Sequence, residues 1–458
     1  MEVSSEGKDN SSSCGTLPIS ARSTDKLELG KLEKNGKTQD KNIRTMQLAT
    51  TDLDALLHVA KSSLGTGLLA MPFAFKHAGV IEGLISTIIV GLICAHGTHL
   101  LVKTSQRMCQ TLKKTSLGYA DTVEAVFSSS RHTRLQSKAS LVRKTVNMFL
   151  FLTYYGAEMS YVVFIAATLK EVTYHNLGYD MNIRLYMIMA IPPLLIIGTV
   201  RSMKYLVPFS MLANMLLLSG VVFISYYVLQ DLPPLSSRPN YIPITKFPIF
   251  FSTVICGLEG IGTILPVENS MRNPHHFLGC PGVLNIAMSI VVSLFTTVGF
   301  FGYWKYGDAV RDTITLSLPE GYVASTVKLL VALAIMFTYG LQMSAVMEVV
   351  WSAIEKKFES KNLDVAYYST RASFVIVTVL SSIAVPQLGP ILSLVGAVGF
   401  STLGLFIPAA VDTILLSESH FSFTNWLVWK NMGMMALAVF ALITGSYLSI
   451  ETIIVDYS

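Results

Sequence analysis

The amino-acid sequence predicts an all-α integral membrane protein with about eleven transmembrane helices. Of its 458 residues, 52% are hydrophobic and only 14% are charged, whereas an average soluble domain has about 25% charged residues. After residue 50, apolar runs near the ~20 residues that a helix needs to cross a bilayer recur along the chain. Two runs are interrupted by glycine and proline at similar spacing, which indicates an inverted repeat with a ligand site near the bilayer midplane.

Residues 1–50 differ sharply from the rest of the chain. They are rich in Ser, Lys, Asp, Glu and Gly and have no aromatic residue, so they cannot bury enough apolar surface to fold alone. We expect a disordered cytoplasmic tail. A cleavable signal peptide is not expected, because the first apolar run starts only near Leu53. The glycosylation sequon Asn10-Ser11-Ser12 lies in this tail and should stay unmodified.

The transmembrane domain is expected over residues 51–455. Its eleven predicted spans are residues 54–75, 80–102, 145–173, 184–200, 206–229, 248–269, 282–303, 322–350, 371–386, 388–414 and 431–452. We predict that residues 54–229 form the first repeat and residues 248–414 the second. Residues 431–452 then form an extra helix.

The distribution of basic residues predicts the orientation. The second-to-third and eighth-to-ninth loops are rich in Lys and Arg, whereas the loops between them carry isolated basic residues. Basic loops stay on the cytoplasmic side, so the N-terminus is predicted to be inside. The formal net charge of +5 therefore orients the chain in a membrane, and we expect no nucleic-acid partner.

The five cysteines show no spacing typical of metal ligands, and two of them, Cys94 and Cys256, lie inside apolar runs. We expect no metal site, no cofactor and no obligatory disulfide. Enzyme signatures such as a phosphate loop, an HExxH motif or a Gly-x-Ser-x-Gly turn are missing from the sequence. A channel is also disfavoured, because no filter-like loop or single-sign charged ring is apparent.

The first interrupted segment is the run HVAKSSLGTGLLAMPFAFKHAG, residues 58–79. Gly65, Thr66 and Gly67 lower helix propensity at its middle, and Pro72 removes a backbone donor soon afterwards. Unpaired backbone is tolerated in a membrane only where protein or a water-filled cavity satisfies it. We therefore predict a broken helix; the alternative is that the two glycines only allow close helix packing.

The second interrupted segment covers residues 257–268. It begins at Gly257, and Gly260 and Gly262 precede Pro266 at nearly the spacing that separates Gly65 and Gly67 from Pro72. A half-helix that begins after Gly67 would point free N–H groups at a carboxylate, and unwound carbonyls in residues 257–262 would accept from an ammonium. A zwitterionic amino acid fits both ends.

Several ionisable residues interrupt the apolar runs. His58 precedes Gly65 by two helical turns and is a candidate proton carrier, or a solvated residue at the cytoplasmic end. Lys61 lies on the same side of the helix. Three roles stay open for it: its side chain snorkels to the cytoplasmic interface, pairs with a carboxylate, or replaces a sodium ion by its fixed charge. Glu259 lies inside the second break and is a candidate for substrate binding and proton coupling. Glu158 interrupts the third span; it forms an ion pair, with Lys61 as a possible partner, or marks substrate access.

Three motifs together resemble the proton-coupled amino acid transporter (PAT) family of the amino acid/auxin permease group, and in particular its insect-type members. They are LLHVAKSSLGTGLLAMPFAFKHAG (56–79), Gly118-Tyr-Ala-Asp121 and GLEGIGTILPVENSMRNP (257–274). The resemblance extends from about Leu53 to the eleventh span.

The resemblance implies a five-plus-five inverted repeat of the amino acid permease or leucine-transporter type. It also implies proton-coupled symport of small neutral amino acids such as alanine, glycine or proline. His58 stands at the family's proton-linked position, and Gly65, Thr66, Gly67, Glu259, Gly260 and Gly262 match its two helix breaks. Two features depart from the family. The loops 174–183 and 304–321 lack the cysteines that vertebrate members join, and Glu158 stands where an uncharged residue is expected.

Two other functions stay open at this point. An amino-acid sensor would bind the same ligand with little flux, and a sodium-coupled carrier would use the same scaffold. Both the plasma membrane and endolysosomal membranes supply a proton gradient, so either is a possible location. The sequence does not determine the oligomeric state.

Overall fold

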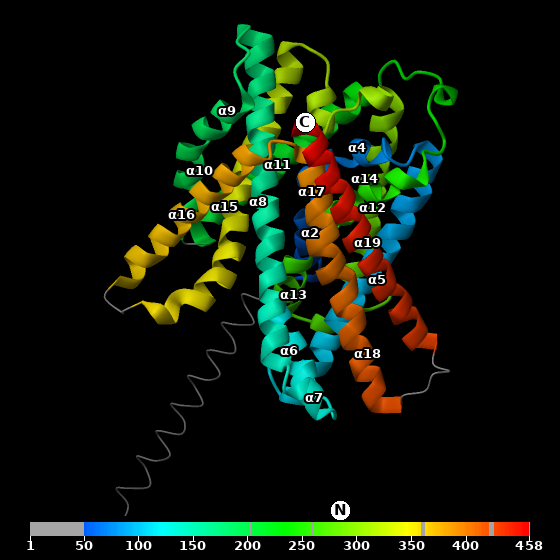
Figure 1. The fold of residues 1–458 in the computed structure, drawn as a ribbon, viewed down its shortest axis with the longest axis vertical. Coiled ribbons are helices and arrows are strands. Elements are labelled where there is room, and N and C mark those ends of the chain that lie inside the picture. Colours follow the sequence, from blue (N-terminus) through cyan, green and yellow to red (C-terminus); the bar gives the residue numbers. More distant parts are fainter. Residues whose placement is uncertain (1–49, 202, 259, 359–361, 421–425, 458) are drawn as a thin grey trace, which may run out of the picture. The chain divides into compact units, whose positions relative to one another are not determined.

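The computed structural model describes residues 50–458 except 202, 259, 359–361, 421–425 and 458. The predicted tail with its sequon, and the candidate Glu259, lie outside the described residues. The described unit, Thr51–Ser458, is almost entirely helical (Figure 1).

The eleven predicted spans all correspond to helical segments. Seven are formed by single helices: α5 (Val80–Leu112), α8 (Ala139–Leu177), α11 (Met203–Leu229), α14 (Val283–Tyr306), α15 (Tyr322–Ile354), α16 (Leu363–Ala384) and α19 (Trp426–Tyr457). Two more are composite: α9 (Ile183–Met189) with α10 (Ile191–Gly198), and α17 (Leu388–Val395) with a π-helical segment (Gly396–Phe406) and α18 (Ile407–His420). The other two are the broken helices described below. Some helices extend well beyond the predicted limits, because a helix continues past the bilayer when its polar end is solvated.

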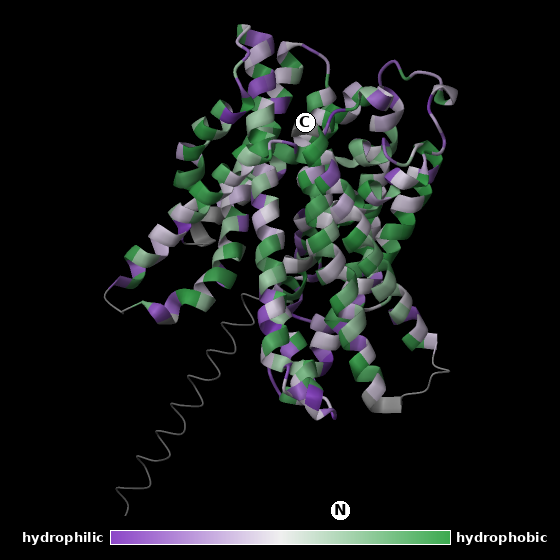
Figure 2. Cartoon of the chain, in the orientation of Figure 1, coloured by the Kyte–Doolittle hydropathy of each residue, from purple (hydrophilic) through white to green (hydrophobic). Residues whose placement is uncertain are grey.

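The outer faces of these helices are apolar, as Figure 2 shows. Large apolar side chains such as Leu92 (67% exposed), Ile196 (71%) and Met215 (72%) are uncovered by protein. Nine helical segments in the described part of the chain are long and apolar enough to cross a membrane, and Ile183–Gly198 is a shorter apolar segment. Since lipid rather than water suits such faces, the chain is a multi-pass membrane protein.

Helix α8 is the long central support of the bundle. In Figure 1 it runs between α15 and α16 on one side and α17 to α19 on the other, and it contacts α15, α16, α9 and α17 directly. Close packing needs a small residue: a Cβ on Gly156 would lie 2.3 Å from a methyl group of Val395 on α17. This close contact fixes which side of α8 faces α17.

The first broken helix consists of α2 (Asp52–Ser63), α3 (Thr66–Leu69) and α4 (Met71–Phe75). Helix α2 ends where the Leu64 N–H donates to the Lys61 carbonyl, and Gly65 is extended, with φ −167° and ψ −151°. The predicted break at Gly65 is confirmed. Pro72 acts differently from the prediction, because it lies in the first turn of α4, where its missing N–H costs little.

The second broken helix consists of α12 (Phe247–Leu258) and α13 (Ile261–Ser270). Gly260, with φ −104° and ψ 33°, immediately precedes α13, and the predicted interruption is again confirmed. Pro266 lies inside α13 and not at the break. The chain therefore has two pairs of half-helices, one near each predicted repeat start. The predicted limits of the two repeats stay a prediction.

Candidate functional site

The two helix breaks are in contact with each other. A Cβ on Gly67 would lie 2.4 Å from the Cα of Gly257, so the two backbones approach more closely than any larger residue allows. The Ser63 hydroxyl also donates to the Leu258 carbonyl at 3.4 Å. Segments almost two hundred residues apart thus form one structure at the centre of the bundle.

The half-helices meet at this contact with opposite partial charges. Helices α2 and α12 end here with carbonyl groups, while α3 and α13 begin here with N–H groups. Among the described residues, no side chain caps the N-terminus of α3 or of α13. Uncapped N–H groups favour an anionic group and free carbonyls favour a cationic one, so a zwitterion suits the pair of breaks.

Two tyrosines of α8 reach the breaks. The Tyr154 hydroxyl lies 1.8 Å from where a Cβ on Gly262 would stand, and the Tyr161 hydroxyl lies 4.0 Å from a Cβ on Gly65. Phe295 of α14 packs against Gly257, with a ring carbon 2.6 Å from a Cβ there. These side chains were not predicted from the sequence. The spacing of residues 154 and 161 by two helical turns does indicate that they share one face of α8.

Glu158 lies between these tyrosines at the midpoint of α8. Its side chain is completely buried, and neither carboxyl oxygen has a hydrogen-bond partner in the described part of the chain. The ion pair with Lys61 considered from the sequence is not formed in this structure. Lys61 instead lies half-buried in the last turn of α2.

The remaining ionisable residues of the two broken helices lie in different surroundings. His58 is exposed on α2, so the structure does not bring it into the buried group around the breaks. Glu268 of α13 is buried, but it accepts a hydrogen bond of 2.9 Å from the Gln106 amide. Glu259 lies outside the described residues.

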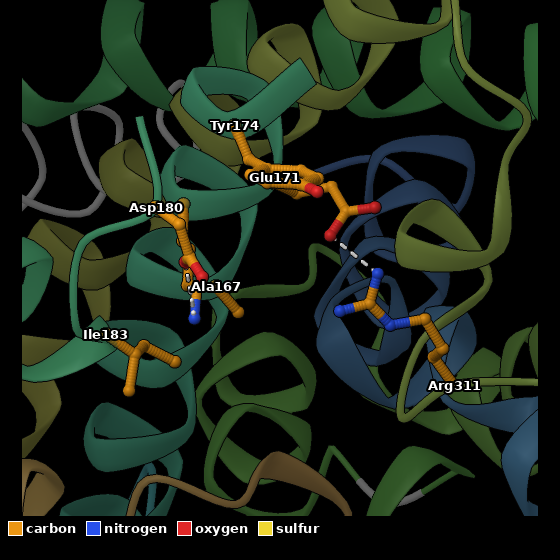
Figure 3. A pocket seen from close by; sticks show the side chains of 7 residues that line it. Ala167, Glu171, Tyr174, Asp180, Ile183 and Arg311 are labelled. Atoms are coloured by element: carbon orange, nitrogen blue, oxygen red, sulfur yellow. Dashed lines mark hydrogen bonds and ion pairs between the residues drawn. The ribbon is translucent and has the colours of Figure 1, made fainter. Parts of the chain in front are cut away.

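A separate pocket of about 330 Å³ lies near the C-terminal end of α8 (Figure 3). Its lining residues are Ala167, Lys170, Glu171, Tyr174, Asp180, Ile183 and Arg311. The charged groups of this pocket are paired with one another: Glu171 with Arg311 at 2.6 Å, and Lys170 with Asp180 at 3.2 Å. Since the pairs already satisfy these charges, we place the candidate substrate site at the breaks and not here.

Known proteins resemble this chain over most of its length. The model of a family described as "Transmembrane amino acid transporter protein" matches residues 49–453. The chain belongs to this transmembrane amino acid transporter family. Its members are transporters, not enzymes.

The relatives narrow the assignment further. The chain is 37% identical over 410 residues, 89% of its length and 86% of the relative's, to the "Proton-coupled amino acid transporter-like protein pathetic" of Drosophila melanogaster. It is 26% identical over 430 residues, 89% of its length and 91% of the relative's, to the "Probable amino acid transporter skat-1" of Caenorhabditis elegans. The resemblance to insect-type members of the PAT family is thereby confirmed.

Solved structures support the fold. The nucleobase-cation-symport-1 family transporter Mhp1, closed with bromovinylhydantoin bound, has a TM-score of 0.51 at 14% identity over 88% of this chain and 92% of its own. Its inward-facing form has a TM-score of 0.52 at 12% identity over 89% and 91%. The similarity shows the fold alone, and the predicted leucine-transporter-type architecture is confirmed.

Proposed function

We propose that this amino acid transporter is a proton-coupled symporter of small neutral amino acids such as alanine, glycine and proline. The observation that carries the proposal is the contact of the two helix breaks at Gly67 and Gly257. It creates one place where free N–H and carbonyl groups face each other. The printed name of the Drosophila relative supports proton coupling.

The substrate carboxylate binds the N–H groups of the first break, at Gly65, Thr66 and Gly67. Its ammonium binds carbonyls of the second break, among residues 257–262, where Gly257, Glu259, Gly260 and Gly262 are the candidates. The rings of Tyr154, Tyr161 and Phe295 pack close to the glycines. Bulky substrates would collide with these rings, which favours a small side chain.

The roles of His58 and Lys61 are part of this proposal. His58 is exposed on the first half-helix, so water can deliver a proton to it. Lys61 carries a fixed positive charge in the last turn before the break, where it disfavours binding of a sodium ion.

The orientation is also proposed. Helix α7 (Thr133–Gln136), in the basic second-to-third loop, lies at the same end of the bundle as the connection between α15 and α16 (Figure 1). Both loops were predicted to be cytoplasmic, which supports an N-terminus inside. The plasma membrane and endolysosomal membranes stay the two candidate locations.

Uptake into liposomes tests the function. The full chain is reconstituted, and uptake of radiolabelled alanine, glycine and proline is measured with outside pH about 5.5 and inside pH about 7.5, with and without sodium. Gradient-dependent accumulation that ignores sodium and collapses with a protonophore is expected. Accumulation driven by sodium alone would contradict the proposal in favour of a sodium-coupled carrier. Saturable binding with no accumulation would indicate a sensor.

A further inference from the structure

Glu158 of α8 is a buried ionisable residue whose carboxyl group makes no hydrogen bond in the described part of the chain. Among the carboxyl groups of the described residues, Glu158 is the one whose two oxygens are both buried and without a hydrogen-bond partner. An unpaired carboxylate in a membrane interior is very costly, and a neutral carboxylic acid costs far less. Glu158 therefore makes no hydrogen bond that would hold α8 in place within the described part of the chain, and its charge state is sensitive to its surroundings.

The position of Glu158 connects it to the helix breaks. Residues 154, 158 and 161 follow the i, i+4, i+7 spacing and share one face of α8. The first and last of them place their hydroxyl groups against Gly262 and Gly65. Glu158 thus lies on the helix face that reaches both breaks, and between the two tyrosines that contact them.

The titratable groups around Glu158 do not neutralise it. Arg371 of α16 interacts with it electrostatically, but the guanidinium donates to the Val200 carbonyl and, at 3.1 Å, to the Ser344 hydroxyl. Tyr339 of α15 bonds to the Thr378 hydroxyl at 3.2 Å. Further titratable groups near these side chains are Tyr154, Tyr155 and Tyr161 on α8 itself, Cys256 on α12, which interacts with Tyr161, and Glu348 on α15, which interacts with Tyr154.

Other elements that pack on α8 add no charge near its midpoint. The segments α3, α17, Gly396–Phe406 and Ile314–Ser317 carry no titratable side chain. The acidic residues of α6 (Tyr119–Ser129), Asp121 and Glu124, pair with Arg143 near the N-terminal end of α8. A change in the charge of Glu158 would therefore act on Tyr161 beside the first break, and on Arg371 and Tyr339 of the neighbouring helices.

We propose that Glu158 binds the proton that is transported together with the amino acid. The inference rests on the proposed symport function and names a residue for its coupling step. The carboxyl is neutral while it is buried as seen here. When alternating access opens the site to the cytoplasm, the O–H bond breaks, the proton leaves to water and the carboxylate stays. A proton from the outer side then restores the neutral acid before the site closes again.

Replacement of Glu158 by glutamine separates coupling from binding. Glutamine keeps the shape and hydrogen-bonding capacity of the neutral acid but cannot release a proton. In the liposome assay, Glu158→Gln is expected to exchange labelled for unlabelled alanine at equal pH within about twofold of the wild type. Its gradient-driven accumulation, and the alanine-evoked acidification seen by an entrapped pH dye, should fall at least tenfold. Glu158→Asp should restore accumulation in part.

The matched control is Glu268→Gln, which changes a buried carboxyl that is already hydrogen-bonded to Gln106. It should keep gradient-driven accumulation within about threefold of the wild type. Accumulation by Glu158→Gln at the wild-type level would overturn the inference and leave the symporter intact. Loss of exchange together with accumulation would also overturn it, since Glu158 would then bind the substrate. If Glu158→Gln does not fold, an unchanged pH dependence of uptake in Glu158→Asp would overturn it. Failure of the wild type to couple would refute the proposed function instead.

Discussion

Helix α8 carries two buried or nearly buried glutamates, Glu158 and Glu171, in opposite situations. Glu171, with 14% of its side chain exposed, accepts from Arg311 at 2.6 Å and from His175 at 3.1 Å, and Lys328 lies 3.8 Å away. Glu158 is fully buried, and neither of its carboxyl oxygens has a hydrogen-bond partner among the residues that the structure describes. Burial alone therefore does not identify a proton-carrying group. The number of partners distinguishes a charge that holds helices together from one whose protonation varies.

The partners of Glu171 come from different parts of the chain. Arg311 lies in the connection after α14, and Lys328 lies on α15. The cluster therefore connects the C-terminal half of α8 to two neighbours, and Figure 3 shows the contact of Glu171 with Arg311. At the midpoint of the same helix, the hydroxyl groups of Tyr154 and Tyr161 lie beside the breaks instead, and Glu158 lies between these two residues along α8. Ion pairs thus hold the C-terminal half of α8, whereas its midpoint carries a buried carboxyl group without a hydrogen-bond partner among the described residues.

The largest effect on transport is expected from a substitution at the contact between the two helix breaks. In Gly67→Ala the new Cβ would lie 2.4 Å from the backbone of Gly257, and backbone cannot move aside cheaply. We expect alanine uptake in liposomes to fall at least tenfold. The control, Gly433→Ala on α19, places its Cβ in open space and should stay within twofold. Wild-type uptake by Gly67→Ala would show that the contact of the breaks is not needed for transport.

A smaller effect is expected on thermal stability, where substitution of Glu171 and of Glu158 should change the Tm differently. Glu171→Gln leaves Arg311, Lys328 and His175 without their shared anion, and this should cost about 1–2 kcal/mol, or a few degrees of Tm. Glu158→Gln replaces an acid that has no partner, so its Tm should match or exceed that of the wild type. Thermal unfolding of the detergent-solubilised protein measures both.

Asp180→Asn is the matched control for Glu171→Gln. Its ion pair with Lys170 is exposed, and such pairs contribute about 0–1 kcal/mol. Equal loss of Tm in Glu158→Gln and Glu171→Gln would contradict the distinction between the two sites, because it would mean that Glu158 is held by interactions of similar strength.

His58 provides a third test of partners and burial. It is exposed on α2 and lies outside the buried group around the breaks. If Glu158 carries the proton, His58→Ala should lower gradient-driven accumulation by no more than about threefold, through slower proton delivery. A complete loss in His58→Ala, with normal coupling in Glu158→Gln, would reverse the two roles.

The sequence predicted the breaks better than it predicted their surroundings. Gly65 and Gly260 act through local backbone preference, and the spans follow from the length of apolar runs, so both could be located along the chain. The contact of Tyr154 with Gly262 depends on how α8 packs against α13. The missing partner of Glu158 depends on side chains of α15 and α16, and no local pattern encodes it. For the same reason a pair of Lys61 with Glu158, one of the alternatives left open by the sequence, could not be judged from the sequence.

The smallest effect concerns His77, a half-buried ring outside the spanning helices, in the turn before α5. Its Nδ1–H donates to the Phe73 carbonyl at 2.9 Å, and burial lowers the pKa of His77 to about 4. Below its ordinary pKa of about 6.5, the unfolded chain binds a proton that the folded chain excludes until about pH 4. The stability that neutral His77 contributes is therefore complete above pH 6.5 and is lost as the pH falls toward 4. Between about pH 7 and pH 5, the Tm of the wild type should fall about one degree more than that of His77→Gln. Parallel Tm curves would show that burial without a charged partner does not make this group pH-sensitive, and would weaken the same argument for Glu158.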